Sequence, residues 1–289
     1  MNLLETVDKY LENPYRVSPR TPSGGFYPSN ASCFIKNEFG EDQCVGKCLR
    51  ASYWKQKSVA QTNPMNARSI RIATCGKLIE QFEIDNYKEM GIWRGNNCKF
   101  YDPDHNISGE MDAFIWDAKM NTIIGVEIKT GYGYEFNKRV MGNTRWEGKP
   151  KADHLLQTMI YKHFMKDIPL FKMVYIDRGN AARIEHNVEL DKNGCARVNG
   201  KMFDKLITIP RIFMRFKELA DHLEDNTIPK RNYALQYTDT KIGLMYDAKK
   251  LNKEQTRQYE KTKKVALGDW QCSYCEYKDY CWYGEGKND

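Results

Sequence analysis

Residues 107–134 read ISGEMDAFIWDAKMNTIIGVEIKTGYGY, and this stretch decides the expected fold. Two runs rich in β-branched and aromatic residues, 107–117 and 122–134, flank the short polar segment AKMN. This pattern is typical of a β-hairpin. The second run is apolar enough for a central strand, apart from Glu127 and Lys129.

The charged residues of this hairpin predict a reactive centre. Side chains alternate along a strand, so Glu127 and Lys129 share one face while Val126 and Ile128 share the other. Antiparallel pairing across the turn is expected to bring the Asp112 carboxylate close to Glu127. Two converging carboxylates suit a hard cation such as Mg²⁺ or Mn²⁺, and Lys129 would orient an attacking water. A simple salt bridge to Lys129 is the ordinary alternative.

The segments on either side of the hairpin complete an α/β pattern. Helical spacing covers 66–90 and 151–167, and apolar runs at 170–177 and 183–190 predict strands. Residues 203–225 are expected to be mostly helix, with Pro210 interrupting or restarting it. The resulting fold class is an α/β core in which helices cover a mixed sheet.

Two features of the expected helices add further candidate residues to the site of Asp112, Glu127 and Lys129. Gly76 lies inside the first helix, where glycine costs about 1 kcal/mol relative to alanine, and close approach of this helix to the sheet would offset the cost. Glu80 would then point toward the hairpin as a further metal ligand. Gln157 and Tyr161 lie at i and i+4 and share one helix face. An exposed glutamate and a half-buried amphipathic pair are the ordinary alternatives.

The ordered series Glu80, Asp112, Glu127-Ile128-Lys129 and Gln157-x-x-x-Tyr161 resembles the motifs of the PD-(D/E)XK nuclease superfamily. The similarity is to its RecB-like branch, which includes iron-sulfur exonucleases of CRISPR adaptation, the AddB nuclease domain and phage relatives. It spans most of residues 45–281. The resemblance implies a restriction-endonuclease-like core, a mixed central sheet flanked by helices.

The same resemblance implies roles for individual residues. Asp112, Glu127 and the backbone carbonyl of Ile128 would bind Mg²⁺ or Mn²⁺, and Lys129 would assist attack of water on phosphorus. Gln157 and Tyr161 would organise the site and touch the DNA strand.

Glu80 departs from the RecB-like pattern, which usually has histidine at this place. Glutamate occupies the equivalent place in other branches, so Glu80 is kept as a metal ligand. The change is expected to favour oxygen-only coordination and to shift the metal preference from manganese toward magnesium.

Nine cysteines in a chain without export features argue against a disulfide framework. Cys272, Cys275 and Cys281 have the spacing C-x2-C-x5-C, whereas zinc ribbons generally supply two close pairs. The triplet resembles the iron-sulfur staple of RecB-like exonucleases, in which four thiolates hold a 4Fe-4S cluster. Zinc in the same thiols is the alternative cofactor.

The fourth cluster ligand is expected near the N-terminus. In the family this cysteine is typically followed by an arginine and aromatic residues, and CLRASYW (48–54) fits this pattern. Cys48 is therefore predicted, with Cys44 and then Cys33 as alternatives. The cluster would join the N- and C-terminal segments. The three isolated cysteines are predicted to be free buried thiols, namely Cys75, Cys98 and Cys195.

Residues 131–151 combine cations with aromatic side chains directly after Lys129. Cations bind phosphates, and aromatic rings such as Tyr132, Tyr134 and Phe136 stack on unpaired bases of any identity. The segment is therefore expected to guide a single strand past the metal, although an ordinary surface loop is the alternative. The predicted DNA contacts are Arg145, Trp146, Lys149, Lys151 and Tyr161.

Charge and hydropathy limit the partners. The chain has 289 residues and a formal net charge of +7, and residues 241–264 hold eight Lys or Arg against three acids. This run indicates either a solvated helix face or a nucleic-acid partner. No stretch reaches the roughly 18 apolar residues that a membrane span needs, so we expect a soluble, cytoplasmic protein without a membrane partner.

The domain organisation is predicted as one nuclease domain over 1–289. It comprises an N-terminal segment 1–65 with one cluster cysteine, a core 66–225, and a basic segment 226–289 with three cluster cysteines. Residues 14–45 begin with a Pro-, Gly- and Ser-rich stretch and are expected to lack regular structure.

The expected function is a divalent-metal-dependent deoxyribonuclease, an exonuclease on single-stranded DNA or DNA ends. Its setting would be recombination and repair, phage DNA processing or CRISPR adaptation. The sequence lacks a GxxxxGK[ST] phosphate loop, so unwinding would come from a separate helicase or a recombination or adaptation protein. The alternatives are a catalytically inactive DNA-binding or assembly subunit, and a site-specific or structure-specific endonuclease of the same superfamily.

Overall fold

The computed structural model describes residues 2–13, 25–96, 98–142, 144–145 and 147–284. Its central sheet is formed by β3 (Trp93–Gly95), β6 (Ala113–Asp117), β7 (Thr122–Gly131), β8 (Phe171–Asp177), β9 (Arg183–Leu190), β10 (Ala196–Val198) and β11 (Lys201–Met202). The strand order is β11-β10-β9-β8-β7-β6-β3. β7 and β8 are parallel, and the other neighbours are antiparallel. The predicted mixed α/β sheet is therefore confirmed.

The β6–β7 hairpin is the predicted one, with Ala113 opposite Val126. Asp117 closes the turn, because its Oδ1 accepts the backbone N–H groups of Lys119 and Met120. The first predicted run is divided, however. Residues Ile107–Met111 form β5, which pairs with β4 (Cys98–Asp102) in a separate two-stranded sheet. Asp112 lies at the corner between β5 and β6, where the chain changes sheets.

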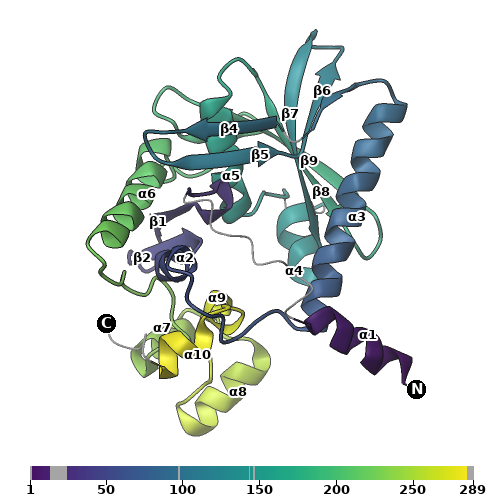
Figure 1. Ribbon diagram of the computed structural model, residues 1–289. Coiled ribbons are helices and arrows are strands. Elements are labelled where there is room, and N and C mark those ends of the chain that lie inside the picture. Colours follow the sequence, from purple (N-terminus) through teal and green to yellow (C-terminus); the bar gives the residue numbers. More distant parts are fainter. Residues whose placement is uncertain (1, 14–24, 97, 143, 146, 285–289) are drawn as a thin grey trace.

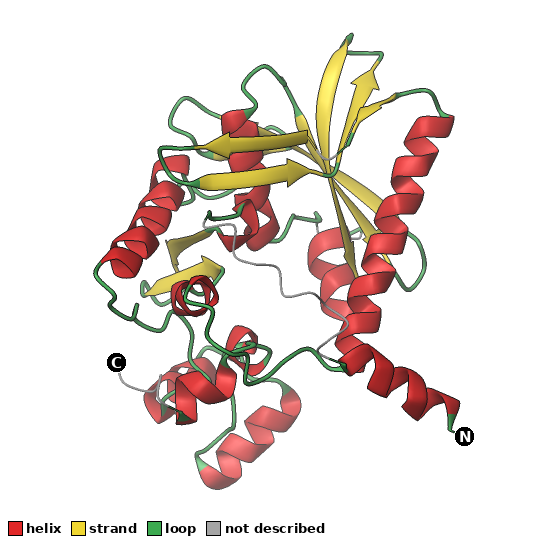
Figure 2. Cartoon of the chain, viewed as in Figure 1, coloured by secondary structure: helices red, strands yellow, loops and turns green. Residues whose placement is uncertain are grey.

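Helices cover both faces of the central sheet (Figure 2). The helix α3 (Ala67–Glu89) packs Ile84 against Val126 and Ile128 of β7. The helix α5 (Ala152–Phe164) adds its apolar residues to the large core that includes Phe171 and Met173 of β8. Since side chains alternate along β7, Glu127 and Lys129 lie on the opposite face from Val126 and Ile128.

Residues 25–46 are more regular than the sequence suggested. A 3₁₀ turn η2 (Pro28–Asn30) precedes β1 (Ser32–Lys36), which pairs with β2 (Asp42–Gly46) as a hairpin. The Asn37 side chain accepts the N–H groups of Phe39 and Glu41 in the connecting turn. The prediction of no regular structure is therefore wrong for the described part of 14–45. Strands of five residues leave too weak a pattern beside a Pro-rich stretch.

The helix α6 (Ile209–Glu224) starts later than predicted, and Pro210 lies in its first turn. Proline is favoured there because the first N–H groups of a helix have no intrahelical acceptor. Thr208 caps the helix by accepting the N–H of Arg211. Of the two predicted roles for Pro210, interrupting or restarting a helix, the structure shows a helix start, and residues 203–208 before it are not helical.

The two ends of the chain pack together. The remaining helices are α1 (Leu3–Glu12), α2 (Leu49–Gln56), α7 (Asp239–Asp247), α8 (Lys253–Thr262), α9 (Trp270–Ser273) and α10 (Lys278–Tyr283). Figure 1 shows α9 and α10 beside α2, far from them in sequence. Thr62 and Asn63 both donate backbone N–H groups to the Glu276 carbonyl, and Arg50 donates from Nε to the Pro229 carbonyl. The N- and C-terminal segments are thus joined by hydrogen bonds.

Within the described residues, no helix combines the length and apolar character that crossing a bilayer requires.

Glycine at position 125 permits the tight packing between β7 and β8. A Cβ atom there would lie 2.6 Å from Cε1 and 2.7 Å from Cδ1 of the buried Phe171 ring. We expect Gly125→Ala to lower the free energy of unfolding by about 1–3 kcal/mol, since overpacking displaces neighbours. Urea denaturation followed by circular dichroism measures this change.

Gly243→Ala in α7 is the matched control. Its Cβ would meet only the Tyr259 hydroxyl, at 3.2 Å, and alanine favours the helix by up to about 1 kcal/mol. Equal stability of the two variants would contradict the packing account.

Candidate functional site

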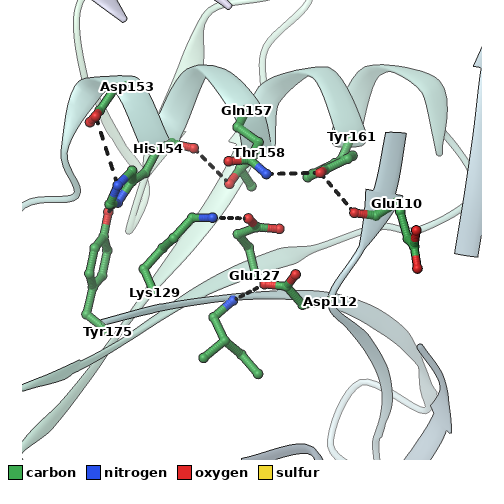
Figure 3. A network of polar contacts seen from close by, with 11 residues as sticks. Glu110, Asp112, Glu127, Lys129, Asp153, His154, Gln157, Thr158, Tyr161 and Tyr175 are labelled. Carbon is green, nitrogen blue, oxygen red and sulfur yellow. Dashed lines mark hydrogen bonds and ion pairs between the residues drawn. The ribbon is translucent and has the colours of Figure 1, made fainter. Parts of the chain in front are cut away.

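Asp112 is fixed to the edge of β7 by a backbone contact. Its Oδ2 accepts the N–H of Ile128 at 2.8 Å, as Figure 3 shows. Burial raises the pKa of Asp112, and the nearby charge of Lys129 together with the Ile128 hydrogen bond opposes this rise. The predicted convergence of Asp112 on the Glu127–Lys129 segment is therefore present.

Glu127 is buried without a full set of partners. Its side chain is 0% exposed, and Lys129 Nζ lies 2.5 Å from its Oε1. Burial, and then the charge of Asp112, raise the pKa of Glu127 to about 8, and Lys129 opposes this rise by its charge and by a side-chain hydrogen bond. Oε2 of Glu127 has no hydrogen-bond partner among the described residues. The site thus holds a carboxylate that needs further positive charge to stay ionised.

Lys129 supplies one positive charge to this group. Burial lowers its pKa, but the carboxylates of Glu127 and Asp112 raise it by more, so the net shift is upward. Lys129 is therefore an ammonium ion at neutral pH. The predicted salt bridge also exists, within β7 and not across strands.

Glu80 lies on α3, close enough to Asp112 and Lys129 for their charges to change its pKa. Burial and then the charge of Asp112 raise its pKa, and Lys129 opposes the rise. The close approach of α3 that Gly76 predicted is confirmed, because a Cβ there would lie 3.2 Å from the Thr130 hydroxyl of β7.

Gln157 and Tyr161 form the predicted pair on one face of α5. Gln157 Nε2 donates to the Tyr161 hydroxyl at 3.0 Å, and that hydroxyl donates to the Glu110 carbonyl at 2.9 Å (Figure 3). These bonds tie α5 to the strand that leads into Asp112. The Tyr161 ring is only 3% exposed, which fits a positioning role and does not fit direct contact with a DNA strand.

His154 and Tyr175 belong to the same network, and the sequence reasoning missed them. Their rings stack with centroids 5.7 Å apart, and the His154 Nδ1 atom lies 3.2 Å from the Tyr175 hydroxyl. The Asp153 carboxylate is 4.0 Å from the other ring nitrogen. Burial lowers the pKa of His154 to about 4, so the ring is neutral at pH 7. The available signal was its position three residues before Gln157, on the same helix face.

Four cysteines from the two ends of the chain line one small cavity. Cys48 begins α2, and the others are Cys272, Cys275 and Cys281. Arg231 also lines this cavity, and its Nε donates to Cys281 Sγ at 3.4 Å. Cys44 instead packs in a buried cluster with Tyr233 and Cys272. Cys48 is thus the described N-terminal cysteine that joins the triplet at this cavity.

The metal assignments themselves stay predictions. Among the described residues, no group of three or more His, Cys, Asp or Glu side chains is arranged to hold a metal ion.

The remaining cysteines differ in part from expectation. Cys195 is buried as predicted, but Cys75 is exposed because it lies on the outer face of α3. The side chain of Cys98 lies outside the described residues.

The predicted DNA-contact segment contains a short helix α4 (Tyr134–Phe136) and a π-helical turn η3 (Asn137–Met141). The side chains of Arg145, Lys149 and Lys151 are exposed, whereas Trp146 lies outside the described residues. Tyr132 and Tyr134 are also exposed, at 70% and 74%. Phe136 is buried near Tyr175 and is therefore unavailable for stacking on bases, contrary to expectation.

Comparison with known proteins assigns no family. No family model and no curated protein matches the chain. A solved structure described as "Crystal structure of SSO0001" aligns with a TM-score of 0.44 and 14% identity, over 96% of this chain and 94% of that one. Similarity at this level carries no conclusion about fold family or function.

The depressed pKa of His154 predicts a pH-dependent stability. The unfolded chain takes up a proton near pH 6.5 and the folded chain only near pH 4. The contribution of the neutral ring is therefore complete above pH 6.5 and is lost as the pH falls toward 4, by up to about 1.4 kcal/mol per pH unit. We expect the difference in unfolding free energy between wild type and His154→Gln to shrink over this range. A difference that stays constant from pH 7 to pH 4 would contradict a neutral buried His154.

Proposed function

We propose that the chain is a divalent-metal-dependent deoxyribonuclease of the PD-(D/E)XK type, acting on single-stranded DNA or DNA ends. The observation that carries this proposal is the convergence of Asp112, Glu127 and Lys129, with both Glu127 oxygens buried, Oε1 in contact with Lys129, and Oε2 without a hydrogen-bond partner among the described residues. A structural salt bridge alone would not require a second, half-buried carboxylate, that of Asp112, beside the buried Glu127.

The donor set fits Mg²⁺ or Mn²⁺. Magnesium commonly binds through one or two carboxylates and keeps several waters, so Asp112 and Glu127 suffice without a third side chain. Asp112 uses Oδ2 for the Ile128 N–H, which leaves Oδ1 for an ion. The Ile128 carbonyl and Glu80 would complete the ligands. When bound, the ion would neutralise phosphate charge and lower the pKa of a bound water.

Lys129 acts in this proposal by position and charge. An ammonium ion has no lone pair and is not a general base, so Lys129 would orient the attacking water or the scissile phosphate by donating hydrogen bonds. Gln157 and Tyr161 would hold α5 against β5 so that Asp112 keeps its place. The exposed Arg145, Lys149 and Lys151 would bind the phosphates of the strand.

We also propose that Cys48, Cys272, Cys275 and Cys281 hold a 4Fe-4S cluster. The support is that these thiols line one cavity although Cys48 and Cys272 are more than two hundred residues apart. The cluster would close this long loop, which restricts the unfolded chain. Its role is architectural in this proposal.

A catalytically inactive DNA-binding or assembly subunit is the second candidate. It is favoured by one observation, namely that Lys129 lies 2.5 Å from Glu127 Oε1, as it would in a purely structural salt bridge.

Nuclease activity should depend on the site residues. We expect wild type to digest linear single-stranded DNA with Mg²⁺ or Mn²⁺ and to spare circular strands. Lys129→Ala should lower the rate by about 10²–10³-fold, the usual effect of removing one group that stabilises developing charge. Lys119→Ala, at the exposed turn of the same hairpin, should keep full activity.

Two results would count against the proposal. Absence of digestion with either metal supports the inactive subunit, and equal rates for Lys129→Ala and wild type remove Lys129 from the chemistry. Cutting of circular strands would indicate an endonuclease.

The cluster proposal has its own spectroscopic test. Protein purified without oxygen should be brown and contain about four iron atoms per chain, as expected for a 4Fe-4S cluster held by four thiolates. Cys48→Ser should lose this iron, whereas the exposed Cys75→Ser should retain it. Colourless protein with stoichiometric zinc would overturn the iron-sulfur assignment and leave the nuclease proposal intact.

A further inference from the structure

The positive charge of the chain is concentrated in residues 241–264, which contain most of α7 and all of α8. We call this segment the basic hairpin. It contains eight Lys or Arg residues and three Asp or Glu residues, a net charge of +5. The whole chain has a net charge of +7, so the other residues share only +2. Neither the carboxylate site nor the cysteine cavity uses this charge.

The second helix of the basic hairpin presents a regular cationic face. Lys253, Arg257 and Lys261 follow at i, i+4 and i+8 and are all exposed, so they lie along one face of α8 about 6 Å apart. Arg257 pairs with Glu254 at the surface, where such a pair contributes little. Lys253 and Lys261 have no acidic partner among the described residues. The α8 helix itself buries no residue.

Two further lysines occupy backbone positions that other residues adopt more readily. Lys249 follows α7 with φ of 55°, and Lys263 caps α8 with φ of 56°. Glycine or asparagine is usual at such left-handed positions. Lysine also interacts favourably with a helix C-terminus, but that effect does not require the left-handed position. Both helix ends therefore carry a lysine at a left-handed backbone position.

The basic hairpin is a folded platform. Ile242 and Leu251 form a buried cluster with Val265, and the rings of Tyr246 and Tyr259 lie 4.7 Å apart. In Figure 1, α8 projects from the body of the molecule on the side away from the β6–β7 hairpin. An ion pair between Lys250 and Glu38 ties the unit to the β1–β2 turn.

The exposed side chains of the basic hairpin distinguish between three anionic partners, namely a membrane surface, a single nucleic-acid strand and a duplex. Among the described residues of the basic hairpin, Leu244 of α7 is the one exposed large hydrophobic side chain and α8 has none, which disfavours insertion into a membrane surface. Tyr246 and Tyr259 pack on each other, so they offer no open platform for unpaired bases. Lysine and arginine on a helix face bind phosphates by releasing counterions, and the double helix has the higher density of phosphate charge.

We propose that the basic hairpin binds the phosphate backbone of double-stranded DNA, independently of base sequence. The binding itself does not depend on nuclease activity. Its consequence for the substrate rests on the proposed function. Because α8 lies on the side of the molecule away from the β6–β7 hairpin, a duplex held there would reach Asp112 and Glu127 only through a long single-stranded overhang, which makes such a duplex the preferred substrate.

The test compares two triple variants with the same loss of charge. The first is Lys253→Gln, Arg257→Gln and Lys261→Gln, and the control uses exposed positions elsewhere, Lys119→Gln, Lys192→Gln and Lys205→Gln. Both carry Lys129→Ala and are studied in EDTA, so that no DNA is cut. Fluorescence anisotropy with a blunt duplex between about 50 and 200 mM salt gives affinity and salt dependence.

We expect the α8 variant to bind duplex at least ten-fold more weakly than the control. The slope of log K against log salt should fall by about 2–3, since each lost phosphate contact removes about 0.9. All six positions are exposed, and circular dichroism should show unchanged folding. Equal affinity of the two variants would overturn the proposal, and so would an equal loss of affinity for an unstructured single strand.

The two proposals fail separately. Duplex binding that depends on α8, in a chain that digests no DNA with any metal, would uphold the basic hairpin and end the nuclease proposal. Digestion of single strands at the wild-type rate by the α8 triple variant made with Lys129 intact, together with unchanged duplex affinity of its Lys129→Ala form, would uphold the nuclease proposal and end the basic-hairpin proposal.

Discussion

Burial of the Glu127 carboxylate beside Asp112 is the constraint on which the rest of the site depends. A buried carboxylate is costly unless its charge is paired and its oxygens are hydrogen-bonded. Lys129 provides the charge at Oε1, but the described residues provide no hydrogen bond to Oε2. Burial and the charge of Asp112 raise the pKa of Glu127 to about 8, so Lys129 alone does not offset the cost of ionising this carboxyl group. A divalent cation would offset the rest of this cost, and a purely structural core residue would not need one.

The surrounding elements hold this unfavourable group in place. The β5–β6 corner presents Asp112 to the Ile128 N–H, and the Gln157–Tyr161–Glu110 hydrogen bonds fix α5 above that corner. On the other face of β7, α3 packs closely through Gly76 and Ile84. The neutral, stacked His154 fills the space between α5 and β8 without adding charge. Preorganised packing of this kind is what a site for charged chemistry requires.

The sequence predicts those features that produce a local periodicity of apolar and polar residues. Alternation revealed the β6–β7 hairpin and the shared face of Glu127 and Lys129, and helical spacing revealed α3, α5 and the Gln157–Tyr161 pair. The features that the sequence did not predict depend on contacts between residues that are distant in sequence. The change of sheets at Asp112 is invisible in a continuous β-like run. The strands β1 and β2 are stable because they pair with each other, and because β1 packs on α6 and β2 on α5. The His154–Tyr175 stack joins a helix to a strand, and no local sequence pattern predicts it.

Direct metal binding tests, without any nucleic acid, whether Asp112 and Glu127 form a site for a divalent cation. Titration of Mn²⁺ into metal-free protein, followed by electron paramagnetic resonance of the free ion, counts the bound sites. We expect one site that is lost in Glu127→Gln and kept in Glu147→Gln, an exposed carboxylate paired with Lys201. Binding that is unchanged in folded Glu127→Gln, or absent in wild type, would rule out a cation site at these two carboxylates.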